Sequence, residues 1–194
     1  MIHRFELRQV AIPNSPGNRG HSRALTAIDA AVLHRIHMGD PDNDNAESIA
    51  LAFDKLGQRM PYTFIVPSAQ PSSDLVIVEQ ACPLWAKTGH ALAWNDRSVG
   101  IGVVGDFRKT KPTVKQKAAI LWLCLRLQDV CTPHLKLRRG TNTDFLVTVH
   151  GALTTGTRDP QKLIGGKEEC PGPLFLPTWR QVRKIVSAAG KVRL

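Results

Sequence analysis

Paired cysteines, long apolar runs and internal repeats are missing from this sequence, and each gap excludes a class of protein. The chain has 194 residues and four cysteines, which are irregularly spaced and form no CxxC pair. This pattern excludes a small disulfide-stapled scaffold and a paired-cysteine zinc finger. No apolar run approaches the length of a membrane-spanning helix, so we expect no membrane span. A hydrophobic content of 42% in a chain of this length predicts one folded domain over residues 1–194.

Acidic residues are few relative to basic ones. The chain has 16 Asp and Glu against 26 Lys and Arg, which gives a formal net charge of +10. Such a surplus attracts polyanions over about 10 Å, and the candidates are nucleic acid and anionic envelope polymers. The basic residues are spread out, with only small clusters at 108–111 and 136–139, and this is equally typical of a solvated surface. Without a nucleic-acid-binding motif or an aromatic–basic platform, nucleic acid is the weaker candidate.

Residues 1–10 lack the uninterrupted apolar stretch of a secretory signal, because Arg4, Glu6 and Arg8 divide it. We therefore expect synthesis in the cytoplasm without a signal peptide. A target outside the cytoplasm would require delivery through a pore or by a secretion machine.

Short apolar runs alternate with amphipathic stretches along the chain, a pattern that favours an α/β fold with a mixed central β-sheet flanked by helices. After the second predicted strand, Asp44 or Asn45 is placed to cap the helix that follows, whose apolar side would hold Ile49, Ala50, Phe53 and Leu56. The pattern predicts strands at residues 5–12, 30–33, 62–66, 74–79, 98–104 and 145–149, and helices at 46–56, 113–130 and 177–188.

Two histidines directly follow short apolar strands, His34 after residues 30–33 and His150 after residues 145–149. Cys170 begins a Cys-Pro-Gly-Pro segment after a polar loop. A thiolate and two imidazoles suit zinc and leave its fourth position open for water, so a zinc site at the rim of the sheet is one interpretation. The other is that these are ordinary rim or core residues.

A competing trio lies at the end of the long predicted helix and consists of Cys124, Cys131 and His134. Cys124 and Cys131 are seven residues apart and share a helix face, as two buried core thiols do. We therefore interpret this pair as part of the core.

A series of short motifs resembles the type 2 N-acetylmuramoyl-L-alanine amidases, a superfamily that includes phage amidase-type lysozymes and peptidoglycan recognition proteins. No single motif is specific, but six occur in the family's order over roughly residues 30–176, leaving 1–29 as an N-terminal extension and 177–188 as a C-terminal helix. The motifs are Ala-Val-Leu-His34, Pro61-Tyr-Thr-Phe-Ile-Val66, Gly89-His-Ala-Leu-Ala-Trp-Asn95, Ser98-Val-Gly-Ile-Gly-Val-Val-Gly105, Val149-His-Gly151 and Cys170-Pro-Gly-Pro173.

The resemblance implies roles for individual residues. His34, His150 and Cys170 match the ligands of a Zn²⁺ ion, and cysteine as third ligand is similar to the phage lysozyme and recognition-protein branch. Tyr62, the only tyrosine, matches the family's active-site tyrosine, whose phenol would stabilise an oxyanion. His90 and Asn95 match a segment near the family's substrate groove, where they either contact substrate or shape the groove.

One position departs from the family's pattern. Many active relatives have Lys or Thr two residues before the third ligand, whereas here that residue is Glu168 and the lysine, Lys167, comes one place earlier. Either the loop shifts to bring Lys167 to the metal, or Glu168 serves as the general base. A third interpretation places Glu168 in solvent.

The resemblance thus implies a zinc-dependent amidase that hydrolyses the amide bond between N-acetylmuramic acid and L-alanine in peptidoglycan. A cell-wall lytic enzyme, such as a phage or prophage lysin or an exported effector, fits the expected delivery without a signal peptide. The alternatives are a non-catalytic peptidoglycan-binding module and a cytoplasmic amidase that recycles soluble muropeptides.

Overall fold

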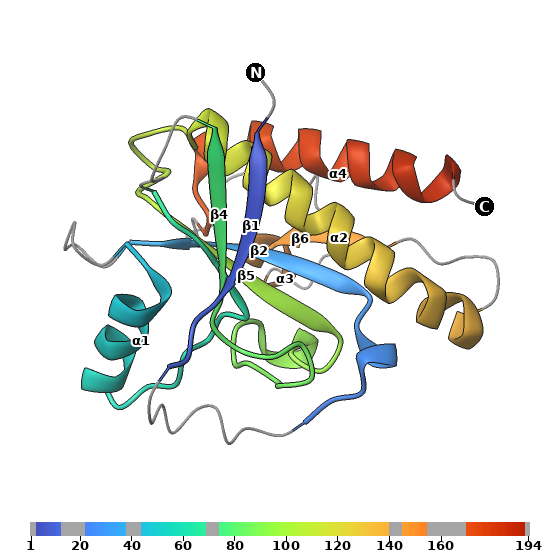
Figure 1. Ribbon diagram of the computed structural model, residues 1–194, viewed down its shortest axis with the longest axis horizontal. Coiled ribbons are helices and arrows are strands. Elements are labelled where there is room, and N and C mark those ends of the chain that lie inside the picture. Colours follow the sequence, from blue (N-terminus) through green and yellow to red (C-terminus); the bar gives the residue numbers. More distant parts are fainter. Residues whose placement is uncertain are drawn as a thin grey trace.

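A six-stranded sheet forms the centre of the part of the chain that the computed structural model describes (Figure 1), namely residues 3–12, 22–37, 44–68, 74–139, 145–154 and 170–192. The strand order is β1-β4-β3-β5-β2-β6. Neighbouring strands are parallel except for β3 and β4, so the sheet is mixed, as the sequence predicts. The strands are β1 (Arg4–Gln9), β2 (Ala30–Ile36), β3 (Phe64–Val66), β4 (Leu75–Gln80), β5 (Ser98–Val104) and β6 (Leu146–Val149).

Two long helices, α2 (Val114–Arg139) and α4 (Leu176–Val192), pack side by side over one face of the sheet (Figure 1). They enclose the larger of two hydrophobic clusters, with Trp179 of α4 almost fully buried and its indole N–H donating to the Val147 carbonyl at 3.1 Å. The remaining helical elements are α1 (Ala46–Lys55), α3 (His150–Thr154) and the short 3-10 turns η2 (Leu25–Ala27), η3 (Leu92–Trp94) and η5 (Pro173–Phe175).

Alternation along β2 divides its side chains between the two faces of the sheet. Ala31 and Leu33 belong to the cluster under α2 and α4, whereas Ile36 belongs to the second cluster, which includes residues of α1. His34 therefore lies on the same face as Ile36. Its register partner on β5 is Gly102.

Helix α1 begins as its sequence predicts. The Asn45 side chain accepts from the Ser48 backbone N–H at 2.9 Å, and the Ser48 side chain accepts in return from the Asn45 backbone, which forms a capping box. Ile49 and Ala50 are buried, but Leu56 is 63% exposed. The prediction that Leu56 packs inward was wrong, because the helix ends at Lys55 and Leu56 is already outside its last turn.

Several predicted boundaries shift when the strands pair. β2 continues through His34 to Ile36, because its ladder with β5 extends to the pair Ile36 and Val104. α2 begins one residue after Thr113, which caps it by accepting from the Gln116 N–H at 3.1 Å, and runs to Arg139 rather than to residue 130. Among the described residues, no helix is both long and apolar enough to cross a membrane.

Candidate metal centre

Adjacent parallel strands bring two of the predicted ligands together. Leu33 of β2 pairs with Val149 of β6, so the next residues, His34 and His150, leave neighbouring positions in the same direction. Cys170 joins them from a distant part of the chain. Its carbonyl accepts from the Gly151 N–H at 2.8 Å, and its Sγ accepts from the Arg35 N–H at 3.4 Å. These bonds dock Cys170 against β2 and against the start of the short helix that follows β6.

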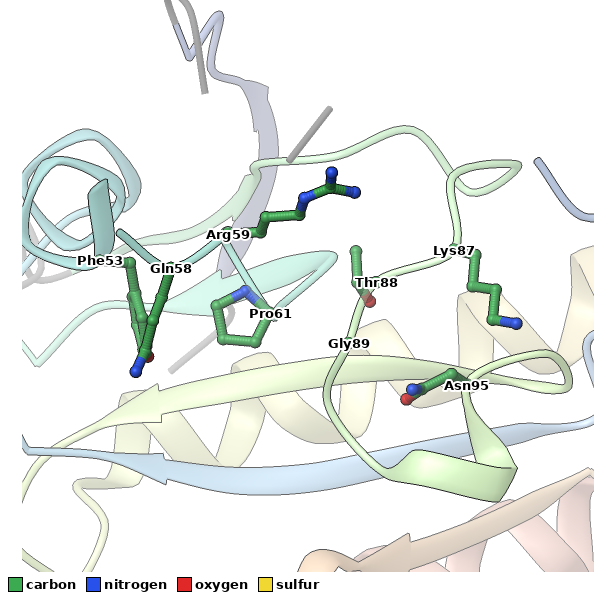
Figure 2. A pocket seen from close by; sticks show the side chains of 8 residues that line it. All are labelled: Phe53, Gln58, Arg59, Pro61, Lys87, Thr88, Gly89 and Asn95. Atoms are coloured by element: carbon green, nitrogen blue, oxygen red, sulfur yellow. The ribbon is translucent and has the colours of Figure 1, made fainter. Parts of the chain in front are cut away.

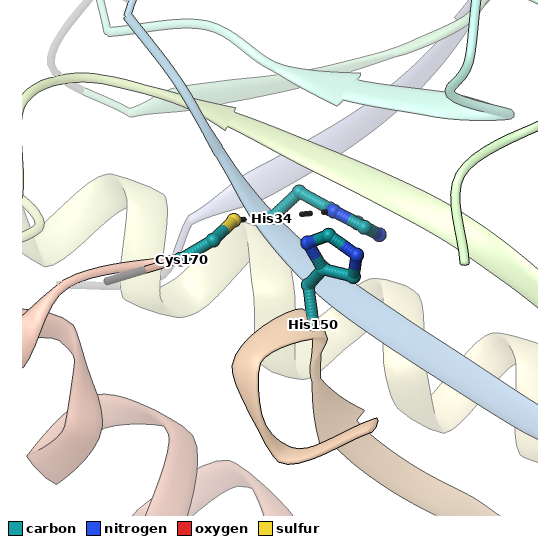
Figure 3. A group of neighbouring side chains, drawn as sticks. All are labelled: His34, His150 and Cys170. Carbon is teal, nitrogen blue, oxygen red and sulfur yellow. Dashed lines mark hydrogen bonds between the residues drawn. The ribbon is translucent and has the colours of Figure 1, made fainter. Parts of the chain in front are cut away.

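The ligand atoms of His34, His150 and Cys170 all lie within 4.8 Å of one another (Figure 3). His34 Nδ1 is 4.0 Å from Cys170 Sγ. Zinc–ligand bonds of about 2.0–2.3 Å place the donor atoms of a tetrahedral site about 3.3–3.6 Å apart, so these atoms would need to close their separations by at most about 1.5 Å to complete the site. The donor set, two imidazoles and one thiol, is also one that zinc prefers. The residues present therefore fit a zinc ion.

Burial sets the protonation state of the histidines. It lowers the pKa of His34 well below its usual range, and the nearby rings of His90 and His150 lower that pKa further. Burial also lowers the pKa of His90 to about 4, despite the opposing effect of a hydrogen bond to Ser98. Both rings are therefore neutral at neutral pH. A neutral imidazole is the form that binds a metal.

Tyr62 lies next to His34, with ring centroids 5.3 Å apart, and its ring also contacts that of Phe53, with centroids 6.1 Å apart. Burial raises the pKa of the Tyr62 phenol above its usual value, and the charge of a Cys170 thiolate raises it further. The phenol therefore keeps its proton and can donate a hydrogen bond. A methyl group at Gly102 would collide with Ile36 and lie 3.0 Å from the Tyr62 ring, so the missing side chain there leaves space for both residues.

A pocket of about 440 Å³ lies beside this cluster (Figure 2). Pro61 and Gly89 in its wall are the immediate neighbours of Tyr62 and His90 in the chain. Lys87 brings a positive charge to the wall and is paired with Asp96 at 2.5 Å. The pocket is lined by Phe53, Gln58, Arg59, Pro61, Lys87, Thr88, Gly89 and Asn95.

The sequence profile of the N-acetylmuramoyl-L-alanine amidases matches residues 24–173, which span the three candidate ligands and Tyr62. The chain belongs to this amidase family. Its resemblance to the type 2 amidase and recognition-protein superfamily is thus confirmed. A comparison with curated proteins finds no match by sequence.

Solved structures with the same fold come from both branches of this superfamily. The N-acetylmuramoyl-L-alanine amidase LysC from Clostridium intestinale URNW is 16% identical, with a TM-score of 0.64, covering 93% of this chain and 97% of that one. The Ph2119 endolysin from Thermus scotoductus MAT2119 bacteriophage Ph2119 is 20% identical, with a TM-score of 0.57, covering 91% and 98%. The ectodomain complex of peptidoglycan recognition proteins LCa and LCx, bound to tracheal cytotoxin, is 18% identical, with a TM-score of 0.61, covering 96% and 95%.

The two residues of the predicted groove segment occupy different places in this amidase. Asn95 lines the pocket, and its side-chain oxygen accepts from the N–H groups of His90 at 3.0 Å and Ala91 at 2.7 Å. His90 is only 6% exposed, and its ring contacts His34 instead of lining the pocket. Direct contact of either residue with substrate stays a prediction.

The proton-transfer candidates Lys167 and Glu168 lie outside the described residues. Sequence reasoning did not identify Arg59, Lys87 or Thr88 as pocket residues, since each belongs to a loop without a periodic pattern. The glycines of β5 are a sequence signal for this site, because they mark a face of the sheet where side chains such as His90 and Tyr62 approach the backbone.

Three other cysteines, which we call the core thiols, are buried: Cys82, Cys124 and Cys131. Burial raises the pKa of Cys124 to about 12 and the pKa values of Cys82 and Cys131 to about 11. Cys124 and Cys131 belong to the cluster under α2 and α4, which agrees with their interpretation as core residues. The side chain of His134, the third member of that trio, is outside the described part of the structure.

Proposed function

We propose that this amidase is a zinc hydrolase that cleaves the amide bond between N-acetylmuramic acid and the L-alanine of the peptidoglycan stem peptide. The observation that carries the proposal is the cluster of His34, His150 and Cys170, in a chain of the amidase family. The ion would be held by Nδ1 of His34, a ring nitrogen of His150 and Sγ of Cys170. When bound, zinc supplies a Lewis acid that polarises a carbonyl and activates water for attack.

The overall reaction consumes one water, which adds its oxygen to the lactyl carbonyl carbon as the bond to the alanine nitrogen breaks. A carboxylic acid and a free amine result. Tyr62 is suited to donate a hydrogen bond to the carbonyl oxygen as negative charge develops there, because its phenol stays protonated. His34 stays neutral because it is buried, and so remains a ligand instead of a competing acid.

The group that transfers the proton to the alanine nitrogen stays a prediction between Glu168 and Lys167. A carboxylate beside the metal is a common acid–base partner in zinc hydrolases. We expect Glu168→Gln to reduce turnover far more than zinc content, as measured by activity and metal analysis of the same sample. Turnover equal to wild type would exclude Glu168 and leave Lys167→Met as the next variant to measure.

The substrate would be polymeric wall or soluble muropeptide. The endolysin and recognition-protein neighbours favour a peptidoglycan-derived ligand, since one of them is bound to tracheal cytotoxin. We infer a wall-lytic role, as in a phage or prophage lysin or an exported effector. Parallel assays on purified sacculi and on soluble muropeptides separate this role from muropeptide recycling.

The deciding experiment is mass analysis of the products released from sacculi. Release of stem peptides with a new L-alanine N-terminus is expected from wild type, and not from Cys170→Ala. Cys124→Ala is the matched control, because it also removes one thiol but from the core under α2 and α4. Cut glycan strands, or equal amide cleavage by Cys170→Ala, would contradict the proposal.

A non-catalytic peptidoglycan-binding module is the second candidate, and the recognition-protein neighbours favour it. Retention of both histidines, the cysteine and Tyr62 argues for catalysis. The two candidates differ in zinc content and in sensitivity to a chelator. A binding module would retain sacculi binding without releasing any product.

A further inference from the structure

His90 is buried behind His34, and each ring nitrogen of His90 faces a different partner. Nε2 lies 3.2 Å from the Ser98 carbonyl oxygen and 3.4 Å from Ser98 Oγ. Ser98 Oγ donates its own hydrogen to the Trp94 carbonyl at 2.6 Å. Both atoms in front of Nε2 can therefore only accept, so Nε2 must carry the hydrogen of the His90 ring.

That assignment determines the tautomer of His34. With its hydrogen on Nε2, the neutral His90 ring presents a bare Nδ1, which lies 3.2 Å from His34 Nε2. A hydrogen bond between the two rings then requires His34 to carry its hydrogen on Nε2. His34 Nδ1 is left with a free lone pair, and this is the atom that faces Cys170 Sγ at 4.0 Å.

We propose that His90 is a positioning residue: it fixes the tautomer and the ring orientation of His34 so that Nδ1 is presented to zinc before the metal arrives. A histidine ligand usually donates its second N–H to a carboxylate, a backbone carbonyl or water. Here the acceptor is another imidazole, that of His90, whose own orientation is fixed by its hydrogen bond to the Ser98 carbonyl. The proposal rests on the proposed metal site but not on the proposed reaction.

The surroundings of His90 hold its ring in this place. Gly100 of β5 lies directly against it, since a side chain there would put its Cβ 2.8 Å from His90 Cγ. Asn95 fixes the His90 backbone by accepting its N–H. The buried Arg23 guanidinium donates to the backbone carbonyl of Asn95 at 2.8 Å and to the backbone carbonyl of Ser98, so one side chain links the backbones of the two residues that accept from His90. The His90 ring is therefore held by packing against Gly100 and by hydrogen bonds at both of its nitrogens.

Zinc affinity tests the proposal without reference to catalysis. In His90→Leu the ring is replaced by an apolar side chain that cannot accept from His34. In His90→Gln an amide oxygen can accept from His34 while the amide N–H donates to Ser98. Competition for zinc ions against a chromogenic chelator should give about 10–100-fold weaker binding for His90→Leu, with His90→Gln within about threefold of wild type. Wild-type affinity in His90→Leu, or an equal loss in both variants, would overturn the proposal.

A second measurement uses the wild-type protein and is independent of how well the variants fold. Imidazole nitrogen NMR of the metal-free protein should find His34 protonated on Nε2 and His90 protonated on Nε2. A hydrogen on His34 Nδ1 would overturn the proposal. If wild type bound no zinc, the proposed metal centre would be wrong, but the NMR measurement would still decide the tautomer of His34. If zinc bound but no amide were cleaved, only the proposed reaction would fail.

Discussion

Gly100→Ala should destabilise this amidase, because the added methyl group points into the His90 ring. Its Cβ would lie 2.8 Å from His90 Cγ and 3.1 Å from both Cβ and Cδ2. Ordinary carbon contacts begin near about 3.5 Å, so the ring must retreat by about half an ångström or more. The ring has little freedom to retreat, since it is hydrogen-bonded to His34 at one nitrogen and to Ser98 at the other. Overpacking of this kind costs about 1–3 kcal/mol.

The assay is urea unfolding of the metal-free protein, followed by circular dichroism. Gly89→Ala is the matched control, because a Cβ at that glycine meets nothing within 4 Å. We expect the control to be neutral or to gain about 0.4–1 kcal/mol from reduced freedom of the unfolded chain. Zinc affinity should fall in Gly100→Ala and not in the control. Equal unfolding free energies for the two alanine variants would refute the packing argument.

Three further predictions concern the metal centre and the core. Tyr62→Phe should lower kcat about a hundredfold with unchanged zinc content, which metal analysis and steady-state rates would check; an unaltered kcat would remove the phenol from the reaction. A thiol reagent should modify one cysteine, Cys170, in the metal-free native protein and none of the core thiols until urea is added, because burial raises their pKa values. Burial also raises the pKa of Glu79. The folded protein is therefore more stable when Glu79 is protonated, and the stability that Glu79 contributes declines as pH rises. The unfolding free energy of Glu79→Gln relative to wild type should therefore increase from about pH 4 to about pH 7, and a decrease would reverse that sign.

Local sequence signals predicted the elements whose side-chain pattern is unambiguous. The observed β5 has the predicted bounds, since its apolar run is buried on both sides of the sheet. Asn45 caps α1 because it and Ser48 have the side chains that a capping box needs. Helix α2 extends past its predicted end with Pro133 inside it. A proline removes one hydrogen bond and disfavours a helix, but packing of the preceding turns against the sheet stabilises the rest.

The sequence by itself determined which residues could hold a metal. His34 and His150 follow apolar strands, Cys170 begins its own motif, and the order of the motifs identifies the family. The tertiary structure decided what surrounds them. His90 is 56 residues from His34 in the chain, and no sequence period relates the two. They meet because Gly100 of β5 has no side chain and so leaves room for the His90 ring beside β2, which carries His34. Residues far apart in sequence come within hydrogen-bonding distance only once the strands pair, so the tautomer of His34 is a property of the fold.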